Sequence, residues 1–289
     1  MSTAATLRRY LDERTFTLAP GIYDGISAKI AENLGFAAAY MTGSGVSASY
    51  GLPDLGLVTQ TEMVNRAAQL CDAISIPVIA DADTGYGNTL NVTRTVQLYE
   101  RAGVAGIHIE DQSFPKKCGH LENKRLVSTA EHVEKLHAAL AARRDENFVI
   151  IARTDARSVE GIDAAIARGK TYANAGADVI FVESPQSREE VERIADEIAT
   201  PLLFNVVARG QTPAIPLGDL QTLGFALAIV PGAATLAATR AITQTYTELA
   251  EHGTFSGIGS DLSPVEFFET VGLSDWTAIE QRYAQPDHS

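Results

Sequence analysis

Four segments of the chain share one hydrophobic pattern, in which a glycine that ends a helix precedes a short apolar run. They cover residues 34–42, 102–110, 175–183 and 223–231. Glycine is the residue expected just past a helix, because it adopts the left-handed conformation without strain. The residue seven places after each glycine should therefore lie where a strand ends. These residues are Thr42, Glu110, Glu183 and Pro231.

Further apolar runs complete the pattern. IPVIAD (76–81) and TPLLFN (200–205) start at or next to a proline, and TFTLAPG near residue 17 and NFVIIARTD near residue 150 resemble them. Amphipathic stretches typical of helices, such as TEMVNRAAQLCDAI and SREEVERIADEIA, lie between these runs. The sequence thus predicts eight strands, each followed by a helix or a helix-like segment.

Strands that are apolar on both faces and alternate with helices favour parallel pairing. Eight such units fit one α/β domain over residues 1–289, a (β/α)8 barrel of the TIM type. An open doubly wound sheet is the alternative, but the repeat is even and shows no reversal of connections. The residues after the eighth strand, about 233–289, predict a C-terminal helical extension that begins with a long helix.

The charge balance limits the expected partners. The 289 residues include 23 Lys and Arg against 36 Asp and Glu, a formal net charge of −13. Nucleic acids and anionic membranes are therefore not expected partners, since both require clustered positive charge. No apolar run approaches the roughly 20 residues of a membrane span. Two cysteines and a charged N-terminal segment predict a cytoplasmic protein with free thiols.

Polar residues gather at the predicted strand ends, where parallel barrels carry their chemistry. The acids among them are Asp81, Asp83, Glu110 and Glu183. Four converging carboxylates would repel one another unless a cation held them. Oxygen ligands favour Mg²⁺ or Mn²⁺ over zinc, so a hard divalent cation is predicted.

The stretch ADADTGYGN is the sharpest local signal. Asp81 and Asp83 are two positions apart, so on a regular strand both would face the same side. The residues that follow predict a loop rather than the start of a helix. Capping of the next helix or turn is the alternative role for the two aspartates.

The connection after the fourth strand, DQSFPKKCGHLENKRLVS, is long enough to predict a lid or a binding loop. A thiol beside two lysines and near a histidine should have a lowered pKa and be able to donate or accept a proton. A buried inert thiol and a zinc ligand are the alternatives for Cys118. Charged neighbours disfavour the first, and the lack of a CxxC motif disfavours the second.

Two other features have more than one interpretation. The segment 43–48 formally matches GxGxxA, but the loop that follows interrupts the helix a dinucleotide would need, so backbone amides facing a carboxylate are expected. His108 is either a buried barrel histidine or a site residue. The other histidines with a predicted helical or terminal position are expected at the surface: His132, His137, His252 and His288.

Taken in order, several motifs resemble the isocitrate lyase and phosphoenolpyruvate mutase superfamily. They are YMTGSG from Tyr40, LPDLG from Leu52, DADTGYG from Asp81, HIEDQ from His108, KKCGH from Lys116, IARTDA from Ile151 and FVES from Phe181. The resemblance covers about residues 5–250, and KKCGH is similar to the lyase branch. It implies a Mg²⁺-dependent barrel that forms a homotetramer in which an eighth helix is exchanged between subunits.

The resemblance also implies roles for individual residues. Asp83 would be the direct metal ligand, with Asp81 and Glu110 holding its waters. Cys118 would be the general acid or base. The other catalytic positions would be Tyr40, Arg153, Glu183 and His120. Substrate-binding positions would be Thr42, Gly43, Ser44, Asp54, His108, Lys116, Gly119 and Asn205.

The chain departs from the pattern of the superfamily that it resembles at positions expected to line the substrate pocket. Methylisocitrate lyases typically place a hydroxyl residue two positions after the asparagine of the seventh strand, where this chain has Val207. Many relatives that act on substituted malates have Glu-Gly-Gly where this chain has Ala208-Arg209-Gly210. After the eighth strand, this chain has the small residues Pro231-Gly232-Ala233 where relatives often have bulkier ones. All three changes concern the substituents at C3 of the substrate.

The expected activity is therefore carbon–carbon cleavage of a small-molecule carboxylate. A substituted 2-hydroxy di- or tricarboxylate, of the 2,3-dimethylmalate or 2-methylisocitrate type, would give pyruvate and a second acid. The alternatives are a carboxyvinyl-carboxyphosphonate phosphorylmutase and an oxaloacetate hydrolase or decarboxylase. A protein that only binds a keto acid would have no need for Cys118.

Overall fold

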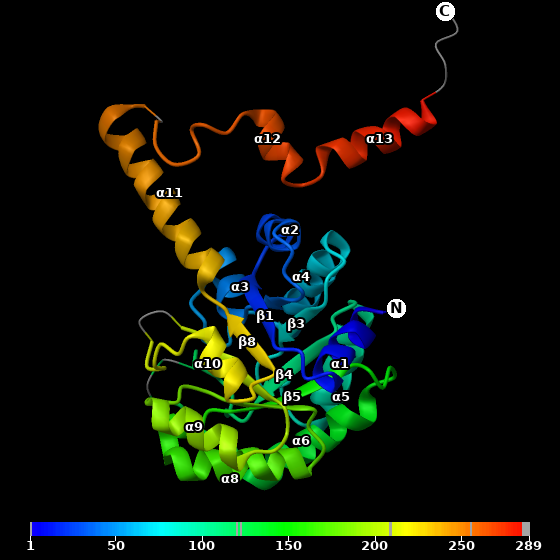
Figure 1. Ribbon diagram of the computed structural model, residues 1–289, viewed down its shortest axis with the longest axis vertical. Coiled ribbons are helices and arrows are strands. Elements are labelled where there is room, and N and C mark those ends of the chain that lie inside the picture. The colour runs from blue at the N-terminus through cyan, green and yellow to red at the C-terminus, as the bar shows by residue number, and fades with distance from the viewer. Residues whose placement is uncertain (1, 120, 122, 208–209, 255, 285–289) are drawn as a thin grey trace, which may run out of the picture.

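In the computed structural model, eight parallel strands close into one barrel, as the sequence pattern predicted (Figure 1). The structure describes residues 2–119, 121, 123–207, 210–254 and 256–284. Neighbouring strands pair in chain order and β8 pairs with β1, which excludes the open sheet. The strands are β1 (Thr17–Ile22), β2 (Ala39–Met41), β3 (Val78–Asp81), β4 (Gly106–Glu110), β5 (Val149–Thr154), β6 (Val179–Val182), β7 (Leu202–Asn205) and β8 (Leu227–Val230).

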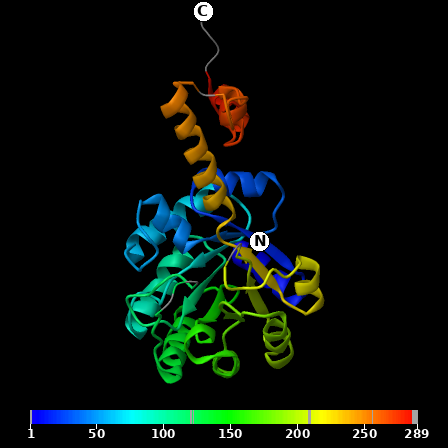
Figure 2. The ribbon, with the colours of Figure 1, turned by 90° about the vertical axis from the view of Figure 1, so that its left-hand side faces the viewer.

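Most of the helices surround the barrel, and the last three extend away from it (Figures 1 and 2). They are α1 (Thr3–Asp12), α2 (Gly25–Asn33), α3 (Gly43–Ser49), α4 (Gln60–Ala73), α5 (Thr89–Arg101), α6 (Thr129–Ala142), α7 (Arg157–Glu160), α8 (Ile162–Asn174), α9 (Arg188–Glu197), α10 (Leu217–Thr222), α11 (Ala233–His252), α12 (Pro264–Glu269) and α13 (Leu273–Tyr283). The four repeat glycines, Gly35, Gly103, Gly176 and Gly224, have φ of +80°, +90°, +99° and +88°. The prediction that they end helices is confirmed.

The apolar residues form two layers. One lies between the sheet and the surrounding helices and includes Ile107, Ile150 and Phe204. The other fills the barrel interior and includes Ile151 and Leu203 of the strands. Helix α1 adds buried leucines to this inner layer. The inner layer supports the strands, whose carboxyl ends carry the site.

The C-terminal extension lies outside the sheet. Helix α11 leaves the barrel after β8 and projects away from it, and α12 and α13 follow at its far end (Figure 2). No residue of α11 is buried, and the structure describes all 20 of them. The amide of Asn33 on α2 donates to the carbonyl oxygen of Thr270 at 3.1 Å, which brings the segment after α12 back toward α2.

Candidate active site

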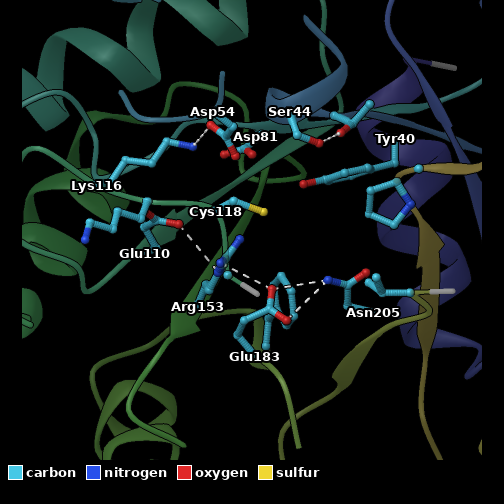
Figure 3. Close-up of a pocket in the computed structure, with 17 residues that line it drawn as sticks. Tyr40, Ser44, Asp54, Asp81, Glu110, Lys116, Cys118, Arg153, Glu183 and Asn205 are labelled. Atoms are coloured by element: carbon cyan, nitrogen blue, oxygen red, sulfur yellow. Dashed lines mark hydrogen bonds and ion pairs between the residues drawn. The ribbon is translucent and has the colours of Figure 1, made fainter. Parts of the chain in front are cut away.

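One pocket, of about 120 Å³, lies at the carboxyl ends of the strands (Figure 3). The residues that line it include twelve named from the sequence: Tyr40, Thr42, Ser44, Asp54, Asp81, Glu110, Lys116, Cys118, Gly119, Arg153, Glu183 and Asn205. Five more complete the lining: Lys117, Phe181, Val207, Pro231 and Gly232. Side chains from nearly every strand thus meet in one small cavity.

Arg153 at the end of β5 organises one wall of the pocket. Its Nε lies 2.9 Å from Asp155 Oδ2 and 3.5 Å from Glu110 Oε2, and its Nη2 lies 3.2 Å from Glu183 Oε2. The guanidinium also lies over the ring of Phe181, 5.1 Å from its centroid. These contacts fix a buried positive charge at the pocket surface.

The opposite wall is acidic. Lys116 forms ion pairs with Asp54 and with Asp83, the latter at 2.6 Å. The four acids Asp54, Asp81, Asp83 and Glu110 all raise the pKa of Lys116 and more than offset the effect of burial, which alone would lower it. Lys116 therefore stays charged and joins the connection after β4 to this wall.

The two aspartates of the ADADTGYG motif do not both lie on a regular strand, so that part of the prediction is wrong. β3 ends at Asp81, and Asp83 has φ of +47°, in the left-handed region. Its backbone N–H donates to Asp81 Oδ1 at 2.9 Å. Asn88 caps α5, so neither aspartate caps that helix. The turn places Asp83 beneath the pocket lining, next to Lys116.

The charges near the pocket fit a divalent cation. Six carboxylates (Asp54, Asp81, Asp83, Glu110, Asp155 and Glu183) accompany three buried cations (Lys116, Lys124 and Arg153). One oxygen of Glu110, Oε1, is buried and has no hydrogen-bond partner. Such an excess of buried negative charge is costly without a further cation.

The raised pKa values of Glu110 and Asp83 also fit a site for a divalent cation. Burial raises the pKa of Glu110 well above its usual value, and it raises that of Asp83 to about 6. Burial alone would also raise the pKa of Asp81, but His108, Lys116 and Arg153 bring it below its usual value.

Within the described residues, no three His, Cys, Asp or Glu side chains form a ready metal-binding group. Mg²⁺ often takes only one or two carboxylates and keeps several waters.

His108 does not line the pocket but lies directly behind it. It is fully buried, its ring stacks on Tyr40 with centroids 5.8 Å apart, and Nε2 lies 2.7 Å from the Tyr40 hydroxyl. Nε2 also lies 3.5 Å from Asp81 Oδ1. Burial lowers the pKa of His108 to about 4, so its ring is neutral at pH 7. His108 thus orients Tyr40 rather than contacting the cavity.

The segment after β2 forms a short helix, α3, at the edge of the pocket. Thr42 caps it by accepting a hydrogen bond from the Gly45 N–H, and its hydroxyl lies 3.0 Å from that of Ser44. A side chain on Gly43 would clash with the Asp81 carboxylate. Gly43, predicted to bind substrate, is not among the residues that line the cavity. Its small size lets α3 approach Asp81.

The connection between β4 and α6 places Cys118 in the pocket. Its two ends pair through the bridge between Gln112 and Leu126. The Cys118 N–H donates to the carbonyl oxygen of Asp54 at 3.2 Å. Figure 3 shows the Cys118 sulfur pointing between Arg153 and Tyr40. His120, another predicted site residue, lies outside the described residues, as do Ala208 and Arg209.

The structure adds one residue that the motifs did not single out, Lys124, which acts through Asp155. Asp155 chelates Arg153 through both oxygens, and the buried Lys124 pairs with Asp155 at 2.8 Å. Their proximity depends on a long loop folding back, which local spacing cannot reveal. Val207 and Pro231 place apolar surface beside Asn205.

One expectation about histidines is wrong. His132 was expected at the surface because it lies on an amphipathic helix, but it is fully buried on the inner face of α6. Its ring packs 4.5 Å from that of Tyr172. His137 on the same helix is exposed, as expected, and His288 lies outside the described residues.

Comparison with known proteins identifies the family. Residues 7–250 match the phosphoenolpyruvate phosphomutase family. The chain is 46% identical to 2,3-dimethylmalate lyase of Eubacterium barkeri, over 98% of this chain and 99% of that protein. It is 41% identical to 2-methylisocitrate lyase of Aeropyrum pernix, over 93% and 87% of the two chains. It is 39% identical to the chloroplastic carboxyvinyl-carboxyphosphonate phosphorylmutase of Arabidopsis thaliana, over 96% and 83%.

Solved structures agree with this result. Oxaloacetate acetylhydrolase bound to 3,3-difluorooxalacetate superimposes with a TM-score of 0.95 at 38% identity, covering 99% of this chain and 98% of that one. Phosphonopyruvate hydrolase with oxalate and Mg²⁺ superimposes with a TM-score of 0.89 at 31% identity, covering 99% and 100%. Among the described residues, no helix is both long and apolar enough to cross a membrane.

Proposed function

The chain belongs to the phosphoenolpyruvate mutase/isocitrate lyase superfamily of enzymes, and from that premise we propose that it is a Mg²⁺-dependent carbon–carbon lyase. Its substrate would be a substituted 2-hydroxy dicarboxylate of the 2,3-dimethylmalate type, cleaved to pyruvate and a second carboxylic acid. The observation that carries the proposal is the position of Cys118, which shares one small cavity with Arg153 and the carboxylates.

The acidic wall would hold the metal. Asp83 would be the direct ligand, with Asp81 and Glu110 binding through water, and Mn²⁺ could replace Mg²⁺. The cation would relieve the raised pKa of Glu110 and Asp83 by favouring their charged forms. When bound, it supplies Lewis-acid polarisation of the hydroxyl and carboxylate oxygens of the substrate.

The residues of the chain would carry out the remaining chemistry. Arg153, fixed by Asp155 and Glu183, offsets the negative charge that develops as the bond breaks. Loss of the C2 hydroxyl proton and cleavage of C2–C3 give the keto group of pyruvate and leave the bonding electrons on C3. Cys118 then protonates C3, which releases the second acid. Tyr40, oriented by His108, hydrogen-bonds an oxygen of the substrate.

The shape of the pocket supports a substrate with small alkyl groups at C3. Val207 and Pro231 present apolar surface, and Val207 stands where methylisocitrate lyases typically have a hydroxyl residue. A cavity of about 120 Å³ also suits a compact acid. These features favour the 2,3-dimethylmalate type over 2-methylisocitrate, which carries one more carboxylate.

Release of pyruvate tests the proposal. Lactate dehydrogenase and NADH would report pyruvate formed from citramalate, 2,3-dimethylmalate and 2-methylisocitrate, with Mg²⁺ and with EDTA. Malate and isocitrate have no methyl group on the hydroxyl carbon and would give glyoxylate, which phenylhydrazine would report. We expect release from 2,3-dimethylmalate that EDTA abolishes. Cys118→Ser should lower this release. Cys71→Ser is the matched control for loss of a thiol, because Cys71 lies on α4 and does not line the pocket.

Oxaloacetate chemistry is the second candidate, because the likeness to oxaloacetate acetylhydrolase covers nearly the whole chain. It predicts that oxaloacetate is consumed in a metal-dependent reaction while no hydroxy acid releases pyruvate. A carboxyvinyl-carboxyphosphonate phosphorylmutase would be silent in both assays and would instead rearrange a phosphorus-containing substrate.

We also propose a homotetramer in which α11 is exchanged between subunits. Apolar side chains on α11 are exposed, including Leu236, Ile242 and Tyr246. A largely apolar cavity lies between the base of α11 and α2, lined in part by Ile30 and Ile242. A helix from a second subunit would cover both surfaces.

A further inference from the structure

A buried lysine links the Cys118 segment to Arg153. The side chain of Lys124 is 1% exposed, and its ammonium donates to the carbonyl oxygen of Gly119 and to Asp155 Oδ1 at 2.8 Å. Gly119 is the residue next to Cys118, and Asp155 is the residue that chelates Arg153. The Lys124 side chain therefore contacts both the residue next to Cys118 and the residue that fixes Arg153.

The Asp155 contact bears on the orientation of Arg153. Oδ1 of Asp155 accepts from Arg153 Nη2 at 3.1 Å as well as from Lys124, and Oδ2 accepts from Arg153 Nε at 2.9 Å. Burial alone would raise the pKa of Asp155, but Arg153 and Lys124 hold it well below its usual value. The fully charged carboxylate fixes the plane of the guanidinium.

The Gly119 contact bears on the position of Cys118. Gly119 packs against the barrel so closely that a Cβ would lie 2.6 Å from Arg153 Nη2. Its carbonyl oxygen also accepts from the hydroxyl of Ser184 at 3.3 Å. Lys124 supplies the charged hydrogen bond to this carbonyl, the stronger kind of contact.

The two ends of the connection do not depend on Lys124. Ser113 N–H donates to the carbonyl oxygen of Arg125 at 2.7 Å, and Val127 N–H donates to that of Asp111 at 2.9 Å. Both bonds are between backbone groups. Lys124 instead joins the middle of the connection, at Gly119, to Asp155 just after β5. Its contacts therefore hold the Cys118 segment rather than the two ends of the connection.

We propose that Lys124 is a positioning residue, which fixes Cys118 and Arg153 relative to each other by holding Gly119 and Asp155 together. The inference rests on the proposed function for the role of Cys118 in turnover. Its structural part, that Lys124 holds the Cys118 segment against the barrel, does not depend on any substrate.

The test uses the rate at which iodoacetamide alkylates Cys118, in a Cys71→Ser background that leaves one thiol. We expect alkylation to be at least about tenfold faster in Lys124→Met, because the segment opens more often when its charged contact is lost. Lys124→Arg should stay within about threefold of the parent, since a guanidinium can donate to both acceptors. Lys135→Met is the matched control for loss of a buried lysine that does not line the pocket.

Turnover provides the second readout. In Lys124→Met, kcat should fall about 100-fold while KM changes little, the pattern expected when reacting groups are misplaced by about 1 Å.

A folded Lys124→Met with alkylation and kcat within about threefold of the parent overturns the inference, even if its unfolding midpoint is lower. If this variant does not fold, Asp155→Asn must show the faster alkylation, and a parental rate there overturns the inference. A parent that cleaves no hydroxy acid refutes the proposed function and leaves the alkylation test intact.

Discussion

Gly119 and Arg153 are packed so closely that no side chain fits between them. A Cβ on Gly119 would lie 2.6 Å from Nη2 of Arg153 and 2.7 Å from Cδ of Glu183. Both neighbours are themselves fixed, because they form an ion pair at 3.2 Å. The segment that carries Cys118 can thus reach its position only if residue 119 is glycine.

We therefore expect Gly119→Ala to reduce kcat about 100-fold, because Cys118 would be displaced from the reacting carbon. The melting temperature should change less than turnover does, since the backbone hydrogen bonds that attach the two ends of the connection do not involve residue 119. Gly218→Ala on α10 is the control, as a Cβ there meets nothing within 4 Å. Parental turnover in Gly119→Ala would show that the segment takes another position during catalysis.

Replacement of the proposed acid gives the second prediction. Cys118→Ser should lower kcat by about 10² to 10⁴, the usual contribution of a positioned proton donor, because a hydroxyl is a much weaker acid than a thiol. Binding of oxalate with Mg²⁺, measured by calorimetry, should change only slightly. Equal loss of activity in Cys71→Ser would mean that the thiols act through stability instead.

The barrel could be predicted because its determinants are local. Each strand is a short apolar run, and Gly35, Gly103, Gly176 and Gly224 mark the helix ends that precede four of them. The common location of the acids at the strand ends could be predicted from the same repeat, because a parallel barrel has all its carboxyl strand ends on one face. The pocket accordingly collects twelve of the predicted residues.

Contacts made by irregular segments could not be predicted in this way. Asp83 leaves the strand through a left-handed turn, so alternation along β3 gives no information on its direction. The pairing of Lys124 with Asp155 joins residues 31 positions apart through a loop without a repeat. His132 is polar by type but lies on the buried face of α6, where the apolar neighbours Leu136 and Ala139 indicate its orientation better than its own chemistry.

His132 leads to a prediction about pH. Burial, with Lys135 and Arg168 nearby, lowers its pKa to about 3, whereas the unfolded chain has the usual value near 6.5. Between these values the unfolded state binds more protons, so the stabilisation is complete above pH 6.5 and is lost as the pH falls toward 3. From pH 7.5 to 5.0 the loss should be about 2 kcal/mol.

Urea unfolding at the two pH values measures this loss. His132→Phe, which keeps an aromatic ring against Tyr172, should remove about 2 kcal/mol of the difference between pH 7.5 and 5.0. The same substitution at the exposed His137 should leave the difference as in the parent. An unchanged pH dependence in His132→Phe would mean that other groups cause the acid sensitivity.

The exposed face of α11 gives the last prediction. Ile242, Tyr246 and Leu249 are 51%, 67% and 42% exposed and follow one another at helical spacing, so they form an apolar stripe. Burial of an unpaired charge in this stripe would cost several kcal/mol, so Ile242→Arg should convert the expected tetramer into smaller species. Light scattering coupled to size-exclusion chromatography would show the change in mass. Gln244→Arg adds the same charge on another face of the helix and should remain tetrameric. A parent that elutes as a monomer, or an Ile242→Arg variant that stays tetrameric, would show that no second subunit covers this stripe.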